Sequence, residues 1–206
     1  MSRGRGFVIV ISGPSGAGKG TIAEGALRRF PCLERSVSAT TRPSRAGEIE
    51  GEHYIFKSPD EFGAMVERGE LLEWTTYLDA SYGTPRAQVE QRLAAGSGVL
   101  FEVDVTGARS IKAAYPEAVL VFVAPPSWQA LAARLTARQS ETAAGLARRL
   151  EVARREIEAA DEYDYVIIND DANDAVELLC AIIRAEQARP SRVDLTHLRD
   201  HASTTE

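Results

Sequence analysis

A short glycine-rich segment constrains the fold of this chain more than any other feature. It follows the apolar run at residues 7–12, precedes a helical pattern, and reads Gly13-Pro14-Ser15-Gly16-Ala17-Gly18-Lys19-Gly20-Thr21. Glycines let the backbone curl so that successive N–H groups point at phosphates, while the following helix adds positive potential and Lys19 reaches the β- and γ-oxygens. A purely structural turn would not need the lysine. The segment therefore predicts a strand, a loop that binds a nucleoside triphosphate, and a helix.

The residue after the lysine departs from the usual form of this loop. Gly20 stands where Ser or Thr is common and Thr21 follows it, an order that resembles the loop of adenylate kinases. Because a glycine offers no hydroxyl ligand, we expect Mg²⁺ to be held mainly through triphosphate oxygens and waters.

Composition limits the kinds of partner that the chain can have. The 206 residues are 44% hydrophobic, enough for one domain with its own core, and 30 acidic against 24 basic residues give a net charge of −6. This balance argues against binding nucleic acid. No apolar stretch approaches the roughly 18 residues that span a membrane, and Cys32 and Cys180 are far apart, as suits a reducing compartment. We expect a cytoplasmic protein that does not associate with membranes.

Apolar runs alternate with helical patterns along most of the chain. Four runs, at residues 7–12, 98–104, 119–124 and 165–168, look buried on both faces, which is typical of a parallel sheet covered by helices. Helices are indicated after Lys19, from Thr84-Pro85 with proline at the first helical position, and from Ser127-Trp128 with serine as the cap. The expected fold class is α/β with a central parallel sheet flanked by helices.

The pattern changes between residues 36 and 84. Short strand-like pieces at residues 36–39, 53–56 and 71–77 surround one helix that opens with the capping box Ser58-Pro59-Asp60-Glu61. We interpret residues 36–84 as a mixed α/β subdomain inserted into a core of residues 6–35 and 85–187, within a single domain over residues 1–187.

The two C-terminal segments are predicted to be a charged helix and a tail. Residues 140–163 form an amphipathic stretch rich in Arg and Glu, which indicates a helix whose charges are mostly solvated and paired between residues four apart. Beyond about Arg189 the apolar periodicity is lost, so we expect residues 188–206 to be a disordered tail. His197 and His201 in this tail are a weak candidate for a metal site.

The inserted segment carries a second candidate for phosphate binding. Arg42 and Arg45 lie three apart in a stretch broken by Pro and Gly, so they do not form a helical ion-pair face, although a solvated loop remains an alternative. Guanidinium groups bind a dianionic phosphate through paired N–H donors. Together with Tyr54, Leu72-Glu73-Trp74 and Tyr82-Gly83-Thr84, these residues make the chain similar to the guanylate kinase family over nearly all of residues 6–187.

The resemblance implies a P-loop kinase fold with an inserted GMP-binding subdomain and a helical lid at about residues 134–160. It implies Mg²⁺-dependent transfer of the γ-phosphoryl group of ATP to GMP, giving ADP and GDP in purine nucleotide metabolism. ATP would occupy the loop at residues 13–21, and GMP, with dGMP as a further acceptor, the inserted subdomain. The expected assembly is a monomer or a small homo-oligomer.

The resemblance also implies roles for individual residues on the acceptor side. Arg42 and Arg45, with the hydroxyls of Tyr54 and Tyr82, would hold the GMP phosphate. Ser38, Glu73 and Thr84 match guanine-reading positions. A carboxylate such as Glu73 offers two acceptors to the adjacent N1–H and NH₂ donors of guanine, and adenine has no such donor pair.

Asp104 ends a predicted strand at its carboxyl end, where ligands bind in open α/β sheets. It matches a family position near the acceptor ribose and the waters of Mg²⁺, whereas the neighbouring Thr106 departs from a glutamine found in parts of the family. No side chain is a certain direct ligand of the metal.

On the donor side the resemblance implies that Arg134, Arg138 and Arg149 are lid arginines that act with Lys19 and Arg42 on the migrating phosphoryl group. Asn169 would border the adenine. For any single arginine of this region a surface ion pair is the alternative, and the family spacing is what favours catalysis.

Two other functions remain open at this stage. Domains of this family also serve as protein-interaction modules without ATP chemistry, and the same fold could phosphorylate a different nucleoside monophosphate or a phosphorylated sugar. The intact Lys19 and arginine set argue against the first alternative, and Glu73 with Ser38 argues for guanine.

Overall fold

The structure is a computed structural model that describes residues 6–45, 47–77, 79–136 and 143–193. Its larger sheet contains five parallel strands in the order β2-β7-β1-β8-β9. The strands are β1 (Val8–Ser12), β2 (Leu33–Arg35), β7 (Gly98–Glu102), β8 (Val119–Ala124) and β9 (Tyr165–Ile168). The predicted α/β class with a central parallel sheet is confirmed, and β2 is a strand that the sequence reading missed.

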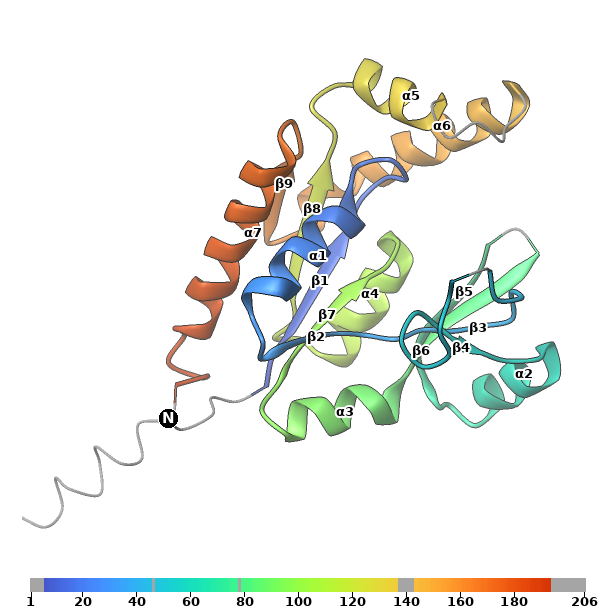
Figure 1. Ribbon diagram of the computed structural model, residues 1–206, viewed down its shortest axis with the longest axis vertical. Helices are drawn as coiled ribbons and strands as arrows, with labels where there is room; N and C mark the ends of the chain where they lie inside the picture. The colour runs from blue at the N-terminus through green and yellow to red at the C-terminus, as the bar shows by residue number, and fades with distance from the viewer. Residues whose placement is uncertain (1–5, 46, 78, 137–142, 194–206) are drawn as a thin grey trace, which may run out of the picture.

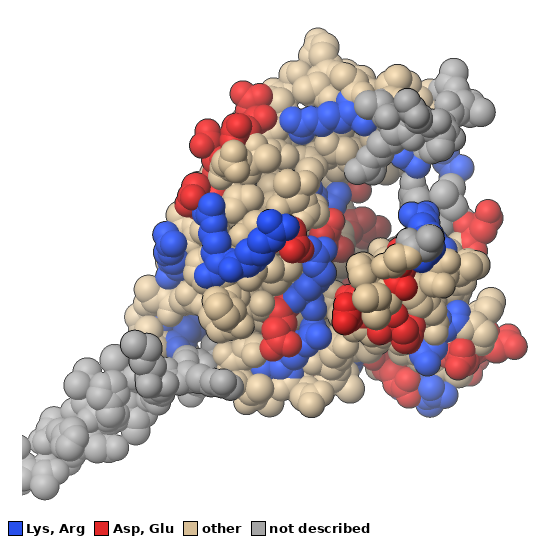
Figure 2. Space-filling model, viewed as in Figure 1, with Lys and Arg blue, Asp and Glu red and all other residues tan. Residues whose placement is uncertain are grey.

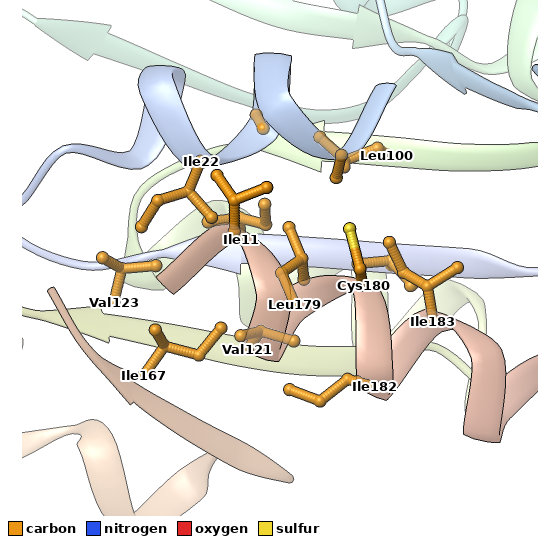
Figure 3. Packing of buried hydrophobic residues seen from close by; sticks show 14 of the residues in the cluster. Ile11, Ile22, Leu100, Val121, Val123, Ile167, Leu179, Cys180, Ile182 and Ile183 are labelled. Atoms are coloured by element: carbon orange, nitrogen blue, oxygen red, sulfur yellow. The ribbon is translucent and has the colours of Figure 1, made fainter. Parts of the chain in front are cut away.

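Alternate residues of the central strand enter two different cores. Ile9 and Ile11 of β1 face α1 (Lys19–Arg29) and α7 (Ala172–Gln187), where they join Ile22 and Leu179. Figure 3 shows Ile11, Ile22 and Leu179 gathered between the two helices and the sheet. Each such side chain contributes roughly 1.5–3 kcal/mol by leaving water.

The opposite face of the sheet has its own core. Val8 and Val10 face α3 (Arg86–Ala94) and α4 (Val105–Ala114), together with Phe101 and Ile111. Helices therefore cover both faces of the sheet (Figure 1), which explains the continuous apolar character of β1, β7 and β8.

The prediction that β9 is buried on both faces is wrong. Only Ile167 is fully buried, while Val166 and Ile168 are 49% and 63% exposed. The reason is position, because β9 is the last strand of the sheet and only the Ile167 side packs into the core with α7.

A second sheet has the order β4-β3-β6-β5 and mixes parallel and antiparallel pairs. It contains β3 (Ala39–Thr40), β4 (Ile55–Phe56), β5 (Leu71–Tyr77) and β6 (Ala80–Pro85), with α2 (Pro59–Glu67) packed on it through Phe62. Figure 1 shows this unit beside the larger sheet. It spans residues 39–85, which is the predicted insertion of residues 36–84 extended by Pro85.

Local chemistry fixes the ends of two helices as predicted. At α2 the hydroxyl of Ser58 accepts from the Glu61 N–H at 3.2 Å, and the Glu61 carboxylate accepts from the Ser58 N–H at 2.8 Å. At α5 (Trp128–Thr136) the Ser127 hydroxyl accepts from the Ala130 N–H at 3.1 Å. These caps satisfy backbone donors that a helix start leaves unpaired.

The helix predicted to begin at Thr84-Pro85 begins later. Thr84 and Pro85 belong to β6, where Pro85 pairs with Leu71, and Pro85 then caps α3 from an extended conformation. The strand pairing holds the residues that the sequence assigned to the first turn, so the proline ends a strand instead of opening a helix.

The Arg- and Glu-rich stretch forms α6 (Ala143–Glu158) followed by the short helix η1 (Ala160–Glu162). Ion pairs join Glu151 to Arg155 and Arg154 to Glu158, as expected. The apolar side of this amphipathic stretch packs on α5, where Ala153 contacts Leu131 and Leu135.

The first residues of the predicted tail are folded. Arg192 is only 7% exposed and pairs with Glu186 of α7 at 2.7 Å, so ordered structure continues past residue 187. The candidate histidines His197 and His201 lie outside the described residues. Within the described residues no helix is long and apolar enough to cross a membrane, and no cluster of three metal-ligating side chains occurs.

Candidate active site

The loop after β1 is held in a tight curve by contacts that require glycine. Gly13 and Gly18 have φ values of 136° and 94°. A Cβ at Gly13 would collide with the carbonyl oxygen of Val123, and one at Gly18 with the side-chain amide of Asn169. Lys19 begins α1 and folds back over the loop, where its Nζ donates to the carbonyl oxygens of Gly13 at 2.6 Å and Pro14 at 3.2 Å. The loop thus brings a cation and the amino end of α1 to one point.

Two other elements support this loop. Asn169, at the end of β9, is buried and donates through Nδ2 to the carbonyl oxygen of Ala17 at 2.6 Å. Arg134 of α5 donates through Nη2 to the backbone carbonyl of Asn169 at 3.1 Å. Asn169 therefore ties the loop to β9 and α5, and its contact with adenine stays a prediction.

The second sheet gathers the residues predicted to hold the acceptor phosphate. The rings of Tyr54 and Tyr82 meet edge to face with centroids 6.1 Å apart, and the Arg42 Cζ lies 5.1 Å from the Tyr54 ring centroid. Tyr82 is on β6 and pairs across the sheet with Thr40, which places it beside the Arg42 loop. Arg45 is exposed, and its described contacts to this loop come from its backbone.

A buried carboxylate lies where the second sheet meets the core. Glu73 of β5 is 8% exposed and accepts from the Thr84 hydroxyl at 2.6 Å. A Cβ at Gly107, in the first turn of α4, would lie 3.3 Å from Glu73 Oε2. Burial raises the pKa of Glu73, and the nearby Asp104 adds to the rise, while the Thr84 hydrogen bond opposes it. Ser38 is half-buried on the adjoining strand segment and accepts from Ile55 through its backbone carbonyl.

Acidic side chains follow β7 at its carboxyl end. Asp104 caps α4 by accepting from the Gly107 N–H at 2.7 Å. Glu102 accepts from Arg35 at 3.2 Å, and its Oε1 would lie 3.5 Å from a Cβ at Gly20. Carboxylates of both residues therefore flank the start of α1 and α4.

A further carboxylate, Glu156, faces this region from α6. Burial raises its pKa to about 7, Lys19 lowers it and Asp104 raises it. A carboxyl group poised near neutrality beside Lys19 is the kind of perturbed group that marks functional sites.

The predicted residues therefore fall into two groups on either side of a hollow. The loop at residues 13–21, Asn169 and Arg134 belong to the core side, with Arg149 half-buried on α6. Arg42, Tyr54, Tyr82, Glu73 and Thr84 belong to the second sheet. Figure 2 shows the surface hollowed between these two parts, with acidic and basic side chains around it. Arg138 lies outside the described residues.

Sequence reasoning missed three carboxylates of the site: Glu48, Glu102 and Glu156. Glu48 is paired to Arg42, which only the folded loop reveals. Glu156 lies three residues from both Ala153 and Ala159, which are buried, so its helical spacing was a usable signal. Glu102 lies two residues before Asp104, on the same side of an extended segment. Its spacing from Asp104 could therefore have identified it as a residue of the same site.

The five-stranded parallel sheet carries a glycine loop with a lysine after its central strand, and a second sheet carries the Arg42-Tyr54-Tyr82 cluster. This fold and this loop define the class of P-loop phosphotransferases. The family model described as guanylate kinase matches residues 5–186. The chain therefore belongs to the guanylate kinase family.

Individual relatives agree with this assignment. A guanylate kinase of Desulfitobacterium hafniense is 45% identical over 192 residues, covering 93% of this chain and 96% of its own length. One from Nocardia farcinica is 50% identical over 188 residues, covering 90% and 97%. The crystal structure of guanylate kinase from Anaplasma phagocytophilum aligns with a TM-score of 0.80 at 31% identity and covers both chains fully. The family resemblance seen in the sequence is confirmed.

Proposed function

We propose that this chain transfers the γ-phosphoryl group of Mg-ATP to GMP, giving ADP and GDP. The observation that carries the proposal is the buried carboxylate of Glu73, which Thr84 fixes beside the first turn of α4. A carboxylate held this way matches the donor pair of guanine, and the Arg42-Tyr54-Tyr82 cluster offers cation and hydroxyl groups for its phosphate.

The donor half of the reaction depends on the loop at residues 13–21. Its backbone N–H groups cradle the triphosphate, and Lys19 exchanges its bonds to Gly13 and Pro14 for phosphate oxygens. Arg134, Arg138 and Arg149 surround the migrating group as α5 and α6 close over it, and Asn169 borders the adenine. Positive charge at these points stabilises the transition state more than the ground state.

The acceptor half needs orientation more than proton transfer. An ionised oxygen of the GMP phosphate attacks the γ-phosphorus while the bond from that phosphorus to the bridging oxygen breaks, and ADP leaves with the electron pair. No general base is needed, because the attacking oxygen carries no proton at neutral pH. Arg42 and Arg45 hold the GMP phosphate in line, Ser38 and Thr84 assist Glu73 at guanine, and Asp104 lies by the ribose.

Magnesium fits the donor set, because Glu102 supplies hard carboxylate oxygens beside Gly20 at the start of α1 and Asp104 supplies others at the start of α4. These residues would hold waters of the ion, and the ion, when bound with ATP, neutralises charge on the phosphates. Closure of the hollow excludes water, which would otherwise take the phosphoryl group.

The proposed setting is purine nucleotide metabolism in the cytoplasm, with ATP and GMP as partners and dGMP as a further acceptor. Both cysteines are free, which supports a reducing compartment.

An ADP-release assay with GMP, dGMP, AMP and no acceptor tests the proposal. We expect turnover with GMP and dGMP, little with AMP, and none above background without acceptor. Activity with AMP alone would indicate another acceptor, and a well-folded chain inactive with every acceptor would indicate an interaction module.

A further inference from the structure

The guanidinium of Arg42 is tied to a carboxylate that has no role in the function proposed above. Its Nη1 donates to Glu48 Oε2 at 2.9 Å and its Nη2 donates to Glu48 Oε1 at 2.7 Å, which makes a bidentate pair. Nη1 also donates to the Pro43 carbonyl oxygen at 2.7 Å. Both side chains are largely shielded, with 14% and 17% of their surfaces exposed. This pair is therefore more than a solvated surface contact.

The same carboxylate reaches the second predicted phosphate-binding arginine. Glu48 Oε2 accepts from the Arg45 backbone N–H at 2.7 Å, and the Glu48 N–H donates to the Arg45 carbonyl oxygen at 3.0 Å. Glu48 thereby closes the loop of residues 42–48 on itself. Positions 42 and 45 are held relative to each other by this one side chain.

The geometry of the guanidinium determines which N–H donors of Arg42 remain for a ligand. Arg42 has five N–H donors in a rigid plane, and the bonds to Glu48 and Pro43 use both protons of Nη1 and one of Nη2. The Nε proton and the second Nη2 proton form the adjacent edge, which is also a fork that fits a phosphate. The Tyr54 ring lies against Arg42, with its centroid 5.1 Å from the Arg42 Cζ, and it meets the Tyr82 ring edge to face. The two tyrosines predicted to bind the phosphate therefore lie on the same side of the loop as this guanidinium.

We infer that Glu48 is a positioning residue for the acceptor phosphate: it fixes one fork of Arg42 so that the other fork receives the phosphate. This inference rests on the proposed function, because it names a supporting group of the same acceptor site. Glu48 touches neither the phosphate nor the reacting atoms and acts through Arg42 and the Arg45 backbone. Supporting partners of this kind govern ligand affinity because they remove the freedom of the binding group.

Simple electrostatics predicts the opposite effect of Glu48 on GMP binding. The direction in which GMP affinity changes when Glu48 is substituted therefore tests the inference. Glu48 is ionised at neutral pH, since the hydrogen bond from Arg42, followed by that from the Arg45 backbone, lowers its pKa to about 2. A negative charge beside a phosphate site repels a dianion, and a carboxylate that competes for Arg42 would inhibit binding. On either of those grounds Glu48→Gln would tighten GMP binding. If Glu48 positions Arg42, the same substitution weakens it.

The test compares Glu48→Gln with Glu52→Gln, which removes the same charge from an exposed position of the same segment. The KM and kcat for GMP are measured at saturating ATP, and the affinity for GMP is measured by calorimetry. Guanosine, tested as a competitive inhibitor, lacks the phosphate and reports on guanine recognition alone. A thermal melt of each variant checks folding.

We expect Glu48→Gln to raise the KM and the dissociation constant for GMP about 10- to 100-fold, the range typical for loss of a supporting partner. The kcat should change by less than about 3-fold, guanosine should inhibit as in the wild type, and Glu52→Gln should behave as the wild type. Glu48→Asp, which keeps the charge on a shorter stem, should give an intermediate KM and serves as the working variant if Glu48→Gln melts early.

Unchanged or tighter GMP binding in Glu48→Gln would overturn the inference, as would an equal loss of GMP and guanosine binding. If the wild type itself does not phosphorylate GMP, the proposed function fails, and that outcome is separate because it is read before any variant is made.

Discussion

Glu73 and Thr84 form a buried hydrogen-bonded contact on the proposed acceptor side. The Thr84 hydroxyl donates a hydrogen bond to Oε1, so the carboxylate is held in one orientation before any ligand arrives. Oε2 lies towards the first turn of α4, where Gly107 leaves room beside it. The residue pair therefore presents acceptors and no free donor to a purine edge.

We predict that Glu73→Gln abolishes the preference for GMP over AMP. Glutamine keeps the size but places an NH₂ donor opposite a guanine donor, which leaves both unpaired in a dry site. Sites built on specific hydrogen bonds discriminate by roughly 10⁴ to 10⁵, and the variant should lose most of this factor. The measurement is kcat/KM for GMP and AMP, with a melt as the control. A folded variant that keeps its preference within a few-fold would mean that other residues read guanine.

Glu156 makes stability depend on pH near neutrality. Its pKa of about 7 is above the ordinary value of about 4.5, so its contribution is full below pH 4.5 and is lost as pH rises towards 7 and above. We predict that Glu156→Gln melts higher than the wild type at pH 8 and equally at pH 4.5. Because the side chain is only half-buried, screening limits the gain to about 2–4 °C.

The measurement is a pair of melting curves across that range, with Glu151→Gln as the matched control, since it removes the same charge from an exposed position of α6. A gain for Glu156→Gln that is as large at pH 4.5 as at pH 8 would show that ionisation of this carboxyl is not its cause.

Residues whose role follows from local chemistry were predictable, and residues whose role depends on a distant neighbour were not. Lys19 and the glycines of its loop needed only their order in the chain. Glu48 was visible as part of the Arg42 loop, but its bidentate contact depends on how residues 42–48 turn. Asn169 was assigned to adenine, yet in the structure its amide supports Ala17, 152 residues away in the chain.

At the scale of elements, the two helix starts with a serine cap were predicted correctly, whereas the start of α3 and the strand edges were not. The capping box at Ser58 and the cap at Ser127 act within one turn, so the sequence alone specifies them. The exposure of β9 and the extension of β6 through Pro85 depend on which strand lies alongside, which is not a local property.

We predict that Ser58→Ala, at the cap of α2, lowers stability by about 1 kcal/mol and the Tm by about 2–4 °C. Because α2 packs on the sheet that carries Glu73 and Tyr82, the KM for GMP should rise while that for ATP stays the same. Ser127→Ala removes the corresponding cap of α5 and is the matched control, with no change expected in the KM for GMP. Equal rises in both KM values for Ser58→Ala would contradict a separate acceptor unit.

In the whole molecule, the proposed site and a buried stabilising cluster lie at opposite ends of the strands of the larger sheet. The site lies at the carboxyl ends of β1 and β7, as in other open α/β sheets. At the amino ends lies a buried cluster in which Glu186, 1% exposed, binds Arg192 at 2.7 Å. Arg192 also donates to the Glu117 carbonyl and covers the Phe7 ring, so it joins the last described segment to the segments that precede β8 and β1.

We predict that a chain truncated after Arg189 is less stable than one truncated after Val193. The shorter chain loses Arg192 and leaves Glu186 buried with Arg189 and the Tyr165 hydroxyl as its partners. Removing one partner of a buried ion pair costs roughly 3–5 kcal/mol when nothing replaces it, and the two remaining partners should reduce this to about 1–3 kcal/mol. The expected fall in Tm is about 3–10 °C.

Turnover per folded molecule at 20 °C should be the same in both truncated chains, because the cluster is at the opposite end of the sheet from Lys19. Equal melting of both truncated chains would show that Arg192 adds nothing to stability, and a loss of kcat in the shorter chain at full folding would show that the two ends of the sheet are coupled.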